Sequence, residues 1–377
     1  MIRSMPRMLL LAVAPALLAG CSLFSSAPQP ADLVKFTPSA ELHVAWRASV
    51  GDGKDYVFQP AVVGESVFAA GADGYVARFE QGKRLWRVNT KSRLTAGVGS
   101  DGNLALVVNE TGQVIALDAE TGEERWRANA GVEVLAPPAI GGGVVVLRAS
   151  DHRLIGLEAE NGQQRWLYQR STPPLALRSH AGVFIVDEVA LVGFPGGKIV
   201  AVSLENGGNL WELNVTRPRG ATELERVADV AGTPVIGRSE VCAVTYQGRA
   251  ACFDVSNGNA LWARDFSSHV GMDRDARFAV IVDERDSIQA LDVYNGATTW
   301  RQDALPRRRL SRPLIVGDYV VAGDGEGYVH AFNREDGVFA ARARADSSAI
   351  AADPRIWADG FVVQSRDGKI VAYEVRR

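Results

Sequence analysis

Residues 112–126, Gly-Gln-Val-Ile-Ala-Leu-Asp-Ala-Glu-Thr-Gly-Glu-Glu-Arg-Trp, contain the pattern that decides the fold of this chain. A short apolar segment ends at Leu117, a turn follows around Gly122, and a second segment leads into Trp126. Two short apolar segments separated by a glycine turn are typical of antiparallel strands. The stretch therefore predicts two neighbouring strands of one sheet.

The apolar segment recurs eight times, at 74–79, 112–117, 152–157, 197–202, 248–253, 286–291, 327–332 and 368–373. A glycine turn follows seven of these copies, and six of the turns lead into Trp86, Trp126, Trp166, Trp211, Trp262 and Trp300. After the seventh turn, Ala341 stands where the tryptophan would be. The copies are 38 to 51 residues apart, and a period of about 40 made of short strands matches a four-stranded propeller blade. We expect each tryptophan to pack between neighbouring blades.

The two ends of the repeat complement each other. The eighth copy, at 368–373, has no tryptophan strand after it, and Trp46 lies in a strand-like segment with no copy before it. We therefore expect the segment around Trp46 to complete the last blade and close the ring, which removes open sheet edges. The sequence predicts an all-β fold, an eight-bladed β-propeller over residues 41–377.

The N-terminal residues have the pattern of an export signal. Arg3 and Arg7 precede an apolar run at 8–18, which is too short to span a bilayer but suits a secretory signal. Small residues followed by Cys21 resemble the bacterial lipobox, which implies cleavage before Cys21 and its triacylation. The alternative is a generic signal peptide with an incidental cysteine. Ser22 at the next position resembles lipoproteins that are sent to the outer membrane.

This pattern divides the chain into three parts. Residues 1–20 are expected to be a lipoprotein signal peptide, and residues 21–40, rich in Ser, Pro and Ala, a lipidated flexible tether. Residues 41–377 are expected to form the propeller. No later apolar run approaches 18 residues, so no further membrane span is expected.

Composition and motifs argue against several classes of function. The formal net charge of −3 argues against a nucleic-acid partner held by bulk electrostatics. The five histidines are isolated, no second ligand stands at metal spacing, and no Gly-x-Ser-x-Gly motif is present. We therefore expect no metal, no cofactor and no catalytic residues.

Cys242 and Cys252 are the other cysteines, and they flank a predicted hairpin on which they would lie nearly opposite each other. In an oxidising compartment they could form a disulfide. Two small buried thiols are the alternative, and the sequence leaves the choice open.

The repeat lengthens in two adjacent steps, of 45 and 51 residues. The first extra segment includes 171–182, with Leu175, Leu177 and Arg178, and the second includes 217–231. Both segments would project from neighbouring blades and form one surface, which makes them candidates for function. Alternatively, Leu175 and Leu177 could begin an inner strand and face the core. Glu223 and Arg226 could equally form a local ion pair at i, i+3.

The tryptophan repeat resembles the quinoprotein-type propeller repeat. Together with the lipobox and the two long loops, the chain resembles the BamB family, lipoproteins of the machinery that inserts β-barrel proteins into the outer membrane. The matching segments are Cys21-Ser-Leu-Phe24, Leu175-Ala-Leu177-Arg178, 222–230, Ser311-Arg-Pro-Leu314 and 323–330.

The resemblance implies how such a protein works and where. It implies a non-enzymatic scaffold on the periplasmic face of the outer membrane, docking on the periplasmic repeats of BamA. It leaves unfolded outer-membrane proteins open as a further partner. The partner-binding residues implied are Leu175, Leu177, Arg178 and Asp229, with Glu223 and Arg226 as secondary candidates.

One departure from the family pattern changes which of these residues are expected to contribute most to partner binding. The family has a second acidic residue two positions after Asp229, where this chain has Ala231. We therefore expect binding to depend more on Leu175, Leu177 and Arg178, with Asp229 nearer the rim of the surface.

Two other functions fit the same fold. A quinone-cofactor dehydrogenase uses such blades, but it needs a calcium site, a catalytic carboxylate and large insertions. A general periplasmic peptide-binding module would use the same loop surface without a dedicated partner.

Overall fold

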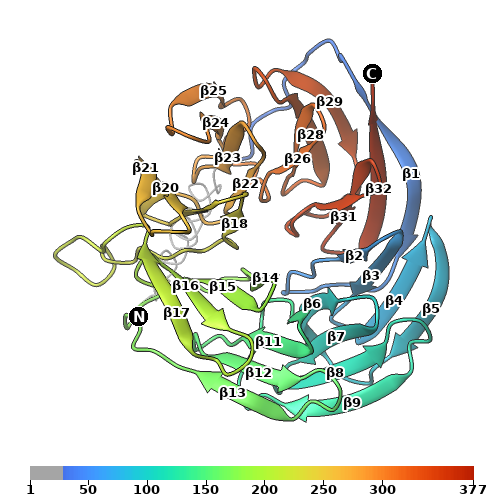
Figure 1. Ribbon diagram of the computed structural model, residues 1–377. Coiled ribbons are helices and arrows are strands. Elements are labelled where there is room, and N and C mark those ends of the chain that lie inside the picture. The colour runs from blue at the N-terminus through green and yellow to red at the C-terminus, as the bar shows by residue number, and fades with distance from the viewer. Residues whose placement is uncertain (1–28) are drawn as a thin grey trace, which may run out of the picture.

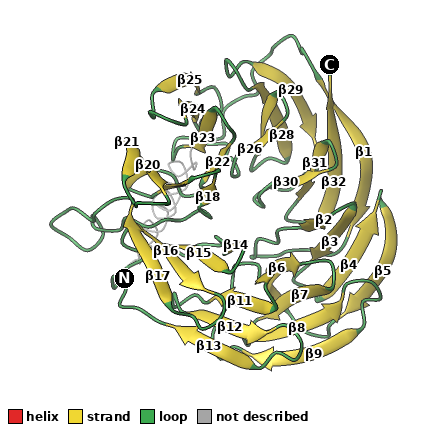
Figure 2. Ribbon diagram, in the orientation of Figure 1, coloured by secondary structure: helices red, strands yellow, loops and turns green. Residues whose placement is uncertain are grey.

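A computed structural model describes residues 29–377, and Cys21 and the predicted signal peptide lie outside the described residues. The described chain forms eight four-stranded antiparallel sheets arranged as blades around a central axis (Figure 1). The first strand of each blade lies nearest the axis and the fourth forms the outer edge, and loops join the strands throughout (Figure 2). The predicted eight-bladed propeller is confirmed. Within residues 29–377 no helix is long and apolar enough to cross a bilayer.

Each of the first four blades is made of consecutive strands. Their bounds are β2 Ala61–Val63, β3 Ser66–Ala70, β4 Tyr75–Glu80, β5 Lys83–Asn89; β6 Leu94–Ser100, β7 Leu104–Asn109, β8 Gln113–Asp118, β9 Glu124–Asn129; β10 Ala139–Gly141, β11 Val144–Arg148, β12 Leu154–Glu158, β13 Gln164–Tyr168; and β14 Phe184–Val186, β15 Val189–Phe194, β16 Lys198–Ser203, β17 Asn209–Asn214.

Blades five to seven follow the same order, and the eighth also takes the first strand of the chain. Their bounds are β18 Val235–Ile236, β19 Glu240–Val244, β20 Gly248–Asp254, β21 Ala260–Phe266; β22 Met272–Arg274, β23 Phe278–Val282, β24 Ile288–Asp292, β25 Thr298–Gln302; β26 Leu314–Val316, β27 Tyr319–Gly323, β28 Tyr328–Asn333, β29 Phe339–Arg344; and β30 Arg355–Trp357, β31 Gly360–Gln364, β32 Lys369–Arg376, β1 Glu41–Ser49.

The ring closes as the sequence predicts. Strand β1 pairs antiparallel with β32, from Glu41 opposite Arg376 to Ser49 opposite Lys369. Trp46 packs edge-on against Trp357, with ring centroids 5.6 Å apart. The N-terminal strand therefore supplies the outer edge of the last blade, and the two ends of the propeller are held by backbone pairing.

The repeated tryptophans join each blade to the next. Trp126 donates its indole N–H to the carbonyl oxygen of Ala159 in the following blade, at 2.8 Å, and its ring lies against Gly162. A side chain at Gly162 would collide with the ring, and the φ of +75° there also favours glycine. The same donation to the next blade is made by Trp86, Trp166, Trp262 and Trp300.

Two junctions depart from this arrangement. Among the described residues no hydrogen bond of this kind is found for Trp211, and Gly258 of the next blade faces Leu213 instead. At the ring closure Trp357, rather than Trp46, donates its indole N–H to the next blade, to the carbonyl of Glu65. Ala341 shares a core cluster with Leu42 and Tyr373, so the entering N-terminal chain fills the space of the missing tryptophan.

Cys242 and Cys252 lie directly opposite each other on β19 and β20, with Cα atoms 4.1 Å apart, and form a disulfide. Both side chains are fully buried. The structure thus selects the disulfide from the two alternatives that the sequence left open.

The strand order assigns the connections to two faces of the ring. Connections between blades, and the turn between the second and third strand of each blade, lie on one face, here called the loop face. The other turns within each blade lie on the opposite face, here called the turn face. Both long insertions connect blades, so both belong to the loop face.

Candidate partner-binding site

The two long connections meet on the loop face. Residues 169–183 join β13 to β14, and residues 215–234 join β17 to β18. The backbone N–H of Leu177 donates to Oδ2 of Asp229 at 2.6 Å, and the hydroxyl of Ser179 donates to the carbonyl of Ala231 at 2.6 Å. The N–H of Gly182 donates to the hydroxyl of Thr233 at 3.1 Å. The two connections therefore form one braced surface, as their adjacency in the repeat predicts.

Leu175 and Leu177 belong to this surface and not to an inner strand. Strand β14 begins only at Phe184, so both leucines precede it in irregular chain. Leu175 is 46% exposed, and Leu177 is half-buried. Single exposed leucines are common on protein surfaces, so the interest of Leu175 rests on its place in the braced pair of loops.

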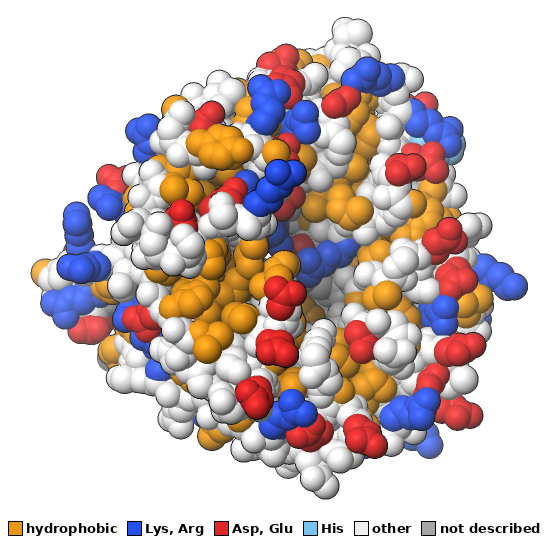
Figure 3. Space-filling model, in the orientation of Figure 1, with side chains coloured by type: hydrophobic (Ala, Val, Ile, Leu, Met, Phe, Trp, Pro, Cys, Tyr) orange, Lys and Arg blue, Asp and Glu red, His pale blue; other side chains and the backbone are white. Residues whose placement is uncertain are grey.

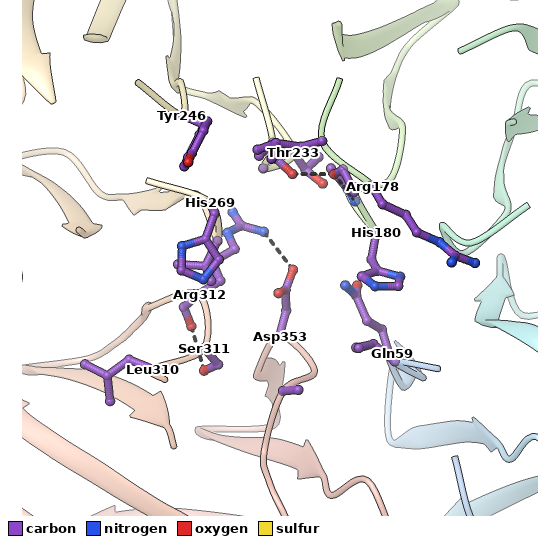
Figure 4. A pocket seen from close by; sticks show the side chains of 18 of the residues that line it. Gln59, Arg178, His180, Thr233, Tyr246, His269, Leu310, Ser311, Arg312 and Asp353 are labelled. Atoms are coloured by element: carbon purple, nitrogen blue, oxygen red, sulfur yellow. Dashed lines mark hydrogen bonds and ion pairs between the residues drawn. The ribbon is translucent and has the colours of Figure 1, made fainter. Parts of the chain in front are cut away.

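Arg178 lies beside the leucines and reaches outward. Its guanidinium pairs with the carboxylate of Glu133 at 2.7 Å, and the Arg178 side chain remains 65% exposed. In Figure 4 the guanidinium of Arg178 points away from the cavity that the neighbouring residues line. Because this ion pair is exposed and therefore weak, a partner can bind the Arg178 guanidinium at little energetic cost.

Asp229 does not lie at the rim, so that expectation is wrong. It is 3% exposed, and its Oδ1 accepts the N–H of Gly196 at 3.1 Å while its Oδ2 holds Leu177. The carboxylate is used inside the chain, because two backbone donors would otherwise be buried without partners. Asp229 thus fixes the backbone that presents Leu177 and Arg178.

A buried arginine lies beneath the same loops. Arg148 is 6% exposed and donates to the carbonyl of Ala181 at 2.9 Å. Burial lowers the pKa of Arg148 to about 10, and the charge of Asp229 offsets part of this effect. The negative charge of Asp229 therefore stabilises the charged form of Arg148 beneath the loops.

Glu223 and Arg226 pair with each other at 3.2 Å, as the local alternative predicted, and both remain about half exposed. The turn that they form is braced by Glu225, whose carboxylate accepts the N–H groups of Ala221 and Thr222. Leu224 stands on this turn and is 70% exposed. Sequence reasoning missed Leu224, although a leucine between acidic residues in an extra loop is a usable signal.

A cavity of about 480 Å³ opens on the loop face beside this surface. Connections from several blades line it, including Leu177, His180, Ala231, Arg312 and Asp353 (Figure 4). Arg312 pairs with Asp353 across it at 3.6 Å. Burial lowers the pKa of His180, so its imidazole is held neutral near pH 7. Figure 3 shows Lys or Arg side chains within the central hollow of the ring.

Within residues 29–377 no group of three or more His, Cys, Asp or Glu side chains is arranged to hold a metal ion. The feature that stands out is the braced pair of loops with exposed Leu175 and Arg178. Fold and site together define the class: an eight-bladed β-propeller whose loop face carries two long connections braced against each other.

The sequence comparisons identify the particular family. A family model described as outer membrane protein assembly factor BamB matches residues 72–302 and 284–377. BamB of Bordetella pertussis is 43% identical over 94% of this chain and 93% of its own length. BamB of Escherichia coli is 35% identical over 96% of each. This chain belongs to the BamB family of outer membrane protein assembly factors.

Solved structures agree on the fold. The crystal structure of BamB from Moraxella catarrhalis superimposes with a TM-score of 0.82 at 26% identity, over 88% of this chain and 99% of that one. A quinohemoprotein alcohol dehydrogenase from Pseudomonas putida reaches a TM-score of 0.72 at 13% identity, over 88% of this chain and 76% of that one. The likeness to the dehydrogenase is one of fold alone. Family membership identifies the chain as an assembly factor and not as an enzyme of that kind.

Proposed function

We propose that this protein is a lipid-anchored scaffold on the periplasmic face of the outer membrane. In this role it docks on the periplasmic repeats of BamA and assists the folding and insertion of outer-membrane proteins. Family membership supports the role in assembly, because the relatives are named outer membrane protein assembly factors. The observation that carries the docking site is the braced pair of loops, which leaves Leu175, Leu177 and Arg178 at the surface.

The surface suits a partner with an apolar pocket and a nearby carboxylate or carbonyl. Leu175 and Leu177 supply apolar contact, and Arg178 supplies five N–H donors in a planar fork. Protein interfaces concentrate their binding energy in a few such residues, with truncation costing about 2 kcal/mol or more. The loops are already ordered by internal hydrogen bonds, so little conformational entropy is lost on binding.

The test is a titration of purified BamA periplasmic repeats against the variants Leu175→Ala, Leu177→Ala and Arg178→Ala. A loss of about 2 kcal/mol corresponds to roughly 30-fold weaker binding. Leu210→Ala is a matched control, because Leu210 is 53% exposed on the outer strand β17, away from the loops. If all three variants bind like the unmodified protein, the docking site lies elsewhere on the ring.

Melting curves separate binding from folding in this test. Leu175 is exposed, so Leu175→Ala should melt normally, whereas half-buried Leu177 should show a small loss. Weak binding that follows early melting would indicate a structural role for the leucines and not a binding role.

Membrane attachment is tested separately. Residues 1–20 are proposed to be removed and Cys21 to be triacylated, because several acyl chains make membrane residence stable where a single chain does not. Docking on BamA can by itself hold the protein at the membrane, so the membranes are first washed with alkaline carbonate to remove peripheral proteins. After this wash, Cys21→Ala should be absent from the outer-membrane fraction. Unchanged outer-membrane fractionation of Cys21→Ala would refute the anchor while leaving the docking proposal intact.

A further inference from the structure

Residues 29–40 are packed on the outside of the ring between the sixth and seventh blades, although the sequence predicts a flexible tether over 21–40. The N–H of Ala31 donates to the carbonyl of Pro306 at 3.0 Å, and buried Arg308 donates to the carbonyl of Ala31 at 2.8 Å. Arg307 donates to the carbonyl of Gln29 at 2.8 Å. The first described residues are therefore fixed to the connection between β25 and β26.

The segment then crosses the ring from one face to the other. Arg342 donates to the carbonyl of Val34 at 3.0 Å, and the ring of Phe36 stacks on Phe339 with centroids 5.2 Å apart. The N–H of Ser39 donates to the carbonyl of Ala340 at 3.0 Å. Pro306–Arg308 belong to the loop face, whereas Phe339 follows a turn of the turn face, so the chain enters at the loop face.

From this path we infer that the loop face of the ring is turned toward the phospholipid surface that holds the anchor. The inference rests on the proposed lipidation of Cys21. Gln29 leaves the ring on the loop face, next to Arg307, and only eight residue steps separate it from Cys21. The anchor and the braced docking loops therefore lie on the same side of the ring, and a docked partner is held on its membrane side.

The length of the connection favours one of the two orientations. Eight residues reach at most about 29 Å when fully extended, and about 16 Å as a flexible coil. The outer strands β25 and β29, beside which the chain leaves the ring, have five and six residues, which corresponds to a height of about 17–20 Å without the turns. With the turn face against the membrane, the connection would have to be stretched beyond its coil length to cross this height. With the loop face toward the membrane, an unstretched connection is sufficient.

The test uses the full lipidated protein in vesicles of phosphatidylethanolamine and phosphatidylglycerol that contain an acceptor fluorophore on lipid. A donor is attached at Ser347→Cys on the loop face or at Ala297→Cys on the turn face, since both positions are exposed. Cys242 and Cys252 are buried and paired, so they do not react with the label. Energy transfer should be clearly greater from position 347. Equal transfer, or greater transfer from position 297, would overturn the inference.

A longer connection serves as the matched control. Inserting sixteen Gly and Ser residues between positions 28 and 29 triples the number of steps to the anchor, so the difference between the two labels should shrink. A difference that survives the insertion unchanged would contradict the tether as its cause. Flotation of the protein with the vesicles reports lipid anchoring by itself, and titration with BamA repeats reports docking. Failure of either is thereby distinguished from failure of the orientation.

Discussion

The carboxylate of Asp229 accepts the backbone N–H of Leu177 at 2.6 Å, although the two residues are 52 positions apart in the chain and belong to different connections. This hydrogen bond joins the insertion after the fourth blade to the insertion after the third. Because Asp229 is buried, its charge is not offered to a partner. In the proposed docking, Asp229 acts through the position of the loop that carries Leu175, Leu177 and Arg178.

Replacement of Asp229 tests this positioning role. Asp229→Ala leaves the N–H groups of Leu177 and Gly196 without acceptors, at a cost of about 1–3 kcal/mol in the free energy of unfolding. Affinity for the BamA repeats should fall at the same time, through faster dissociation. Urea unfolding and binding kinetics measure the two effects. Glu223→Ala, which removes an exposed residue of the same connection, should change stability by less than about 1 kcal/mol.

A rim role for Asp229 would give a different result. The alanine variant would then unfold like the unmodified protein, and the loss of affinity would appear in a salt-dependent association rate. That outcome would contradict the assignment of Asp229 as a positioning residue.

The ring itself was predictable because the same local sequence pattern, with the same preference for short strands and glycine turns, recurs eight times. The apolar segments and glycine turns gave the strands, and the unmatched ends around Trp46 and 368–373 gave the closure. The two long steps correctly located two neighbouring connections that meet on one face. These features depend on local pattern and on chain counting, both of which a sequence displays directly.

Other features depend on contacts between distant residues and were not predictable. The sequence shows Asp229 as a polar residue in a loop, and only the fold shows that Leu177 and Gly196 need its oxygens. The packing of Phe36 on Phe339 joins positions some three hundred residues apart, so the Ser- and Pro-rich segment was interpreted as a free tether.

The interblade tryptophans offer a matched pair for measuring stability. Trp126→Phe removes the indole N–H that donates to the carbonyl of Ala159. It should lower the free energy of unfolding by about 1 kcal/mol beyond the change in packing. For Trp211 no such hydrogen bond is found in the described chain, so Trp211→Phe should cost less. Chemical denaturation compares the two variants. Equal losses would show that the hydrogen bond to the next blade adds no net stability.

The interior of the seventh blade should make stability depend on pH. His330 is fully buried, and its Nε2 lies 2.8 Å from a carboxylate oxygen of Asp324. Arg342 donates to Nδ1 at 3.3 Å, which requires that nitrogen to be unprotonated. Burial, reinforced by the charges of Arg342 and Arg308, lowers the pKa of His330 below its ordinary value, although Asp324 opposes the shift.

The sign of the effect follows from that direction. The unfolded chain takes up a proton at His330 near pH 6.5, while the folded protein does so only at lower pH. The contribution of His330 to the free energy of unfolding is therefore fully present above about pH 6.5. It is lost as the pH falls toward the lowered pKa of the folded protein. The melting temperature of the unmodified protein should drop more between pH 7 and pH 5 than that of His330→Gln, which cannot titrate. Parallel curves for the two proteins would contradict a neutral buried His330.

The last prediction concerns the ion pair that Arg178 makes before any partner arrives. Its guanidinium lies 2.7 Å from Glu133, and both side chains are substantially exposed, so the pair contributes at most about 1 kcal/mol to folding. A partner that uses Arg178 must displace Glu133. Glu133→Gln weakens the internal pair without changing the shape of the side chain, so it should tighten binding to the BamA repeats by up to about fivefold, the equivalent of about 1 kcal/mol. Arg178→Ala should weaken the same binding, and in the Arg178→Ala background Glu133→Gln should have no effect. Binding titrations of the two single variants and the double variant measure the coupling. If Glu133→Gln tightens binding equally with and without Arg178, the gain comes from lower overall charge and not from release of the arginine.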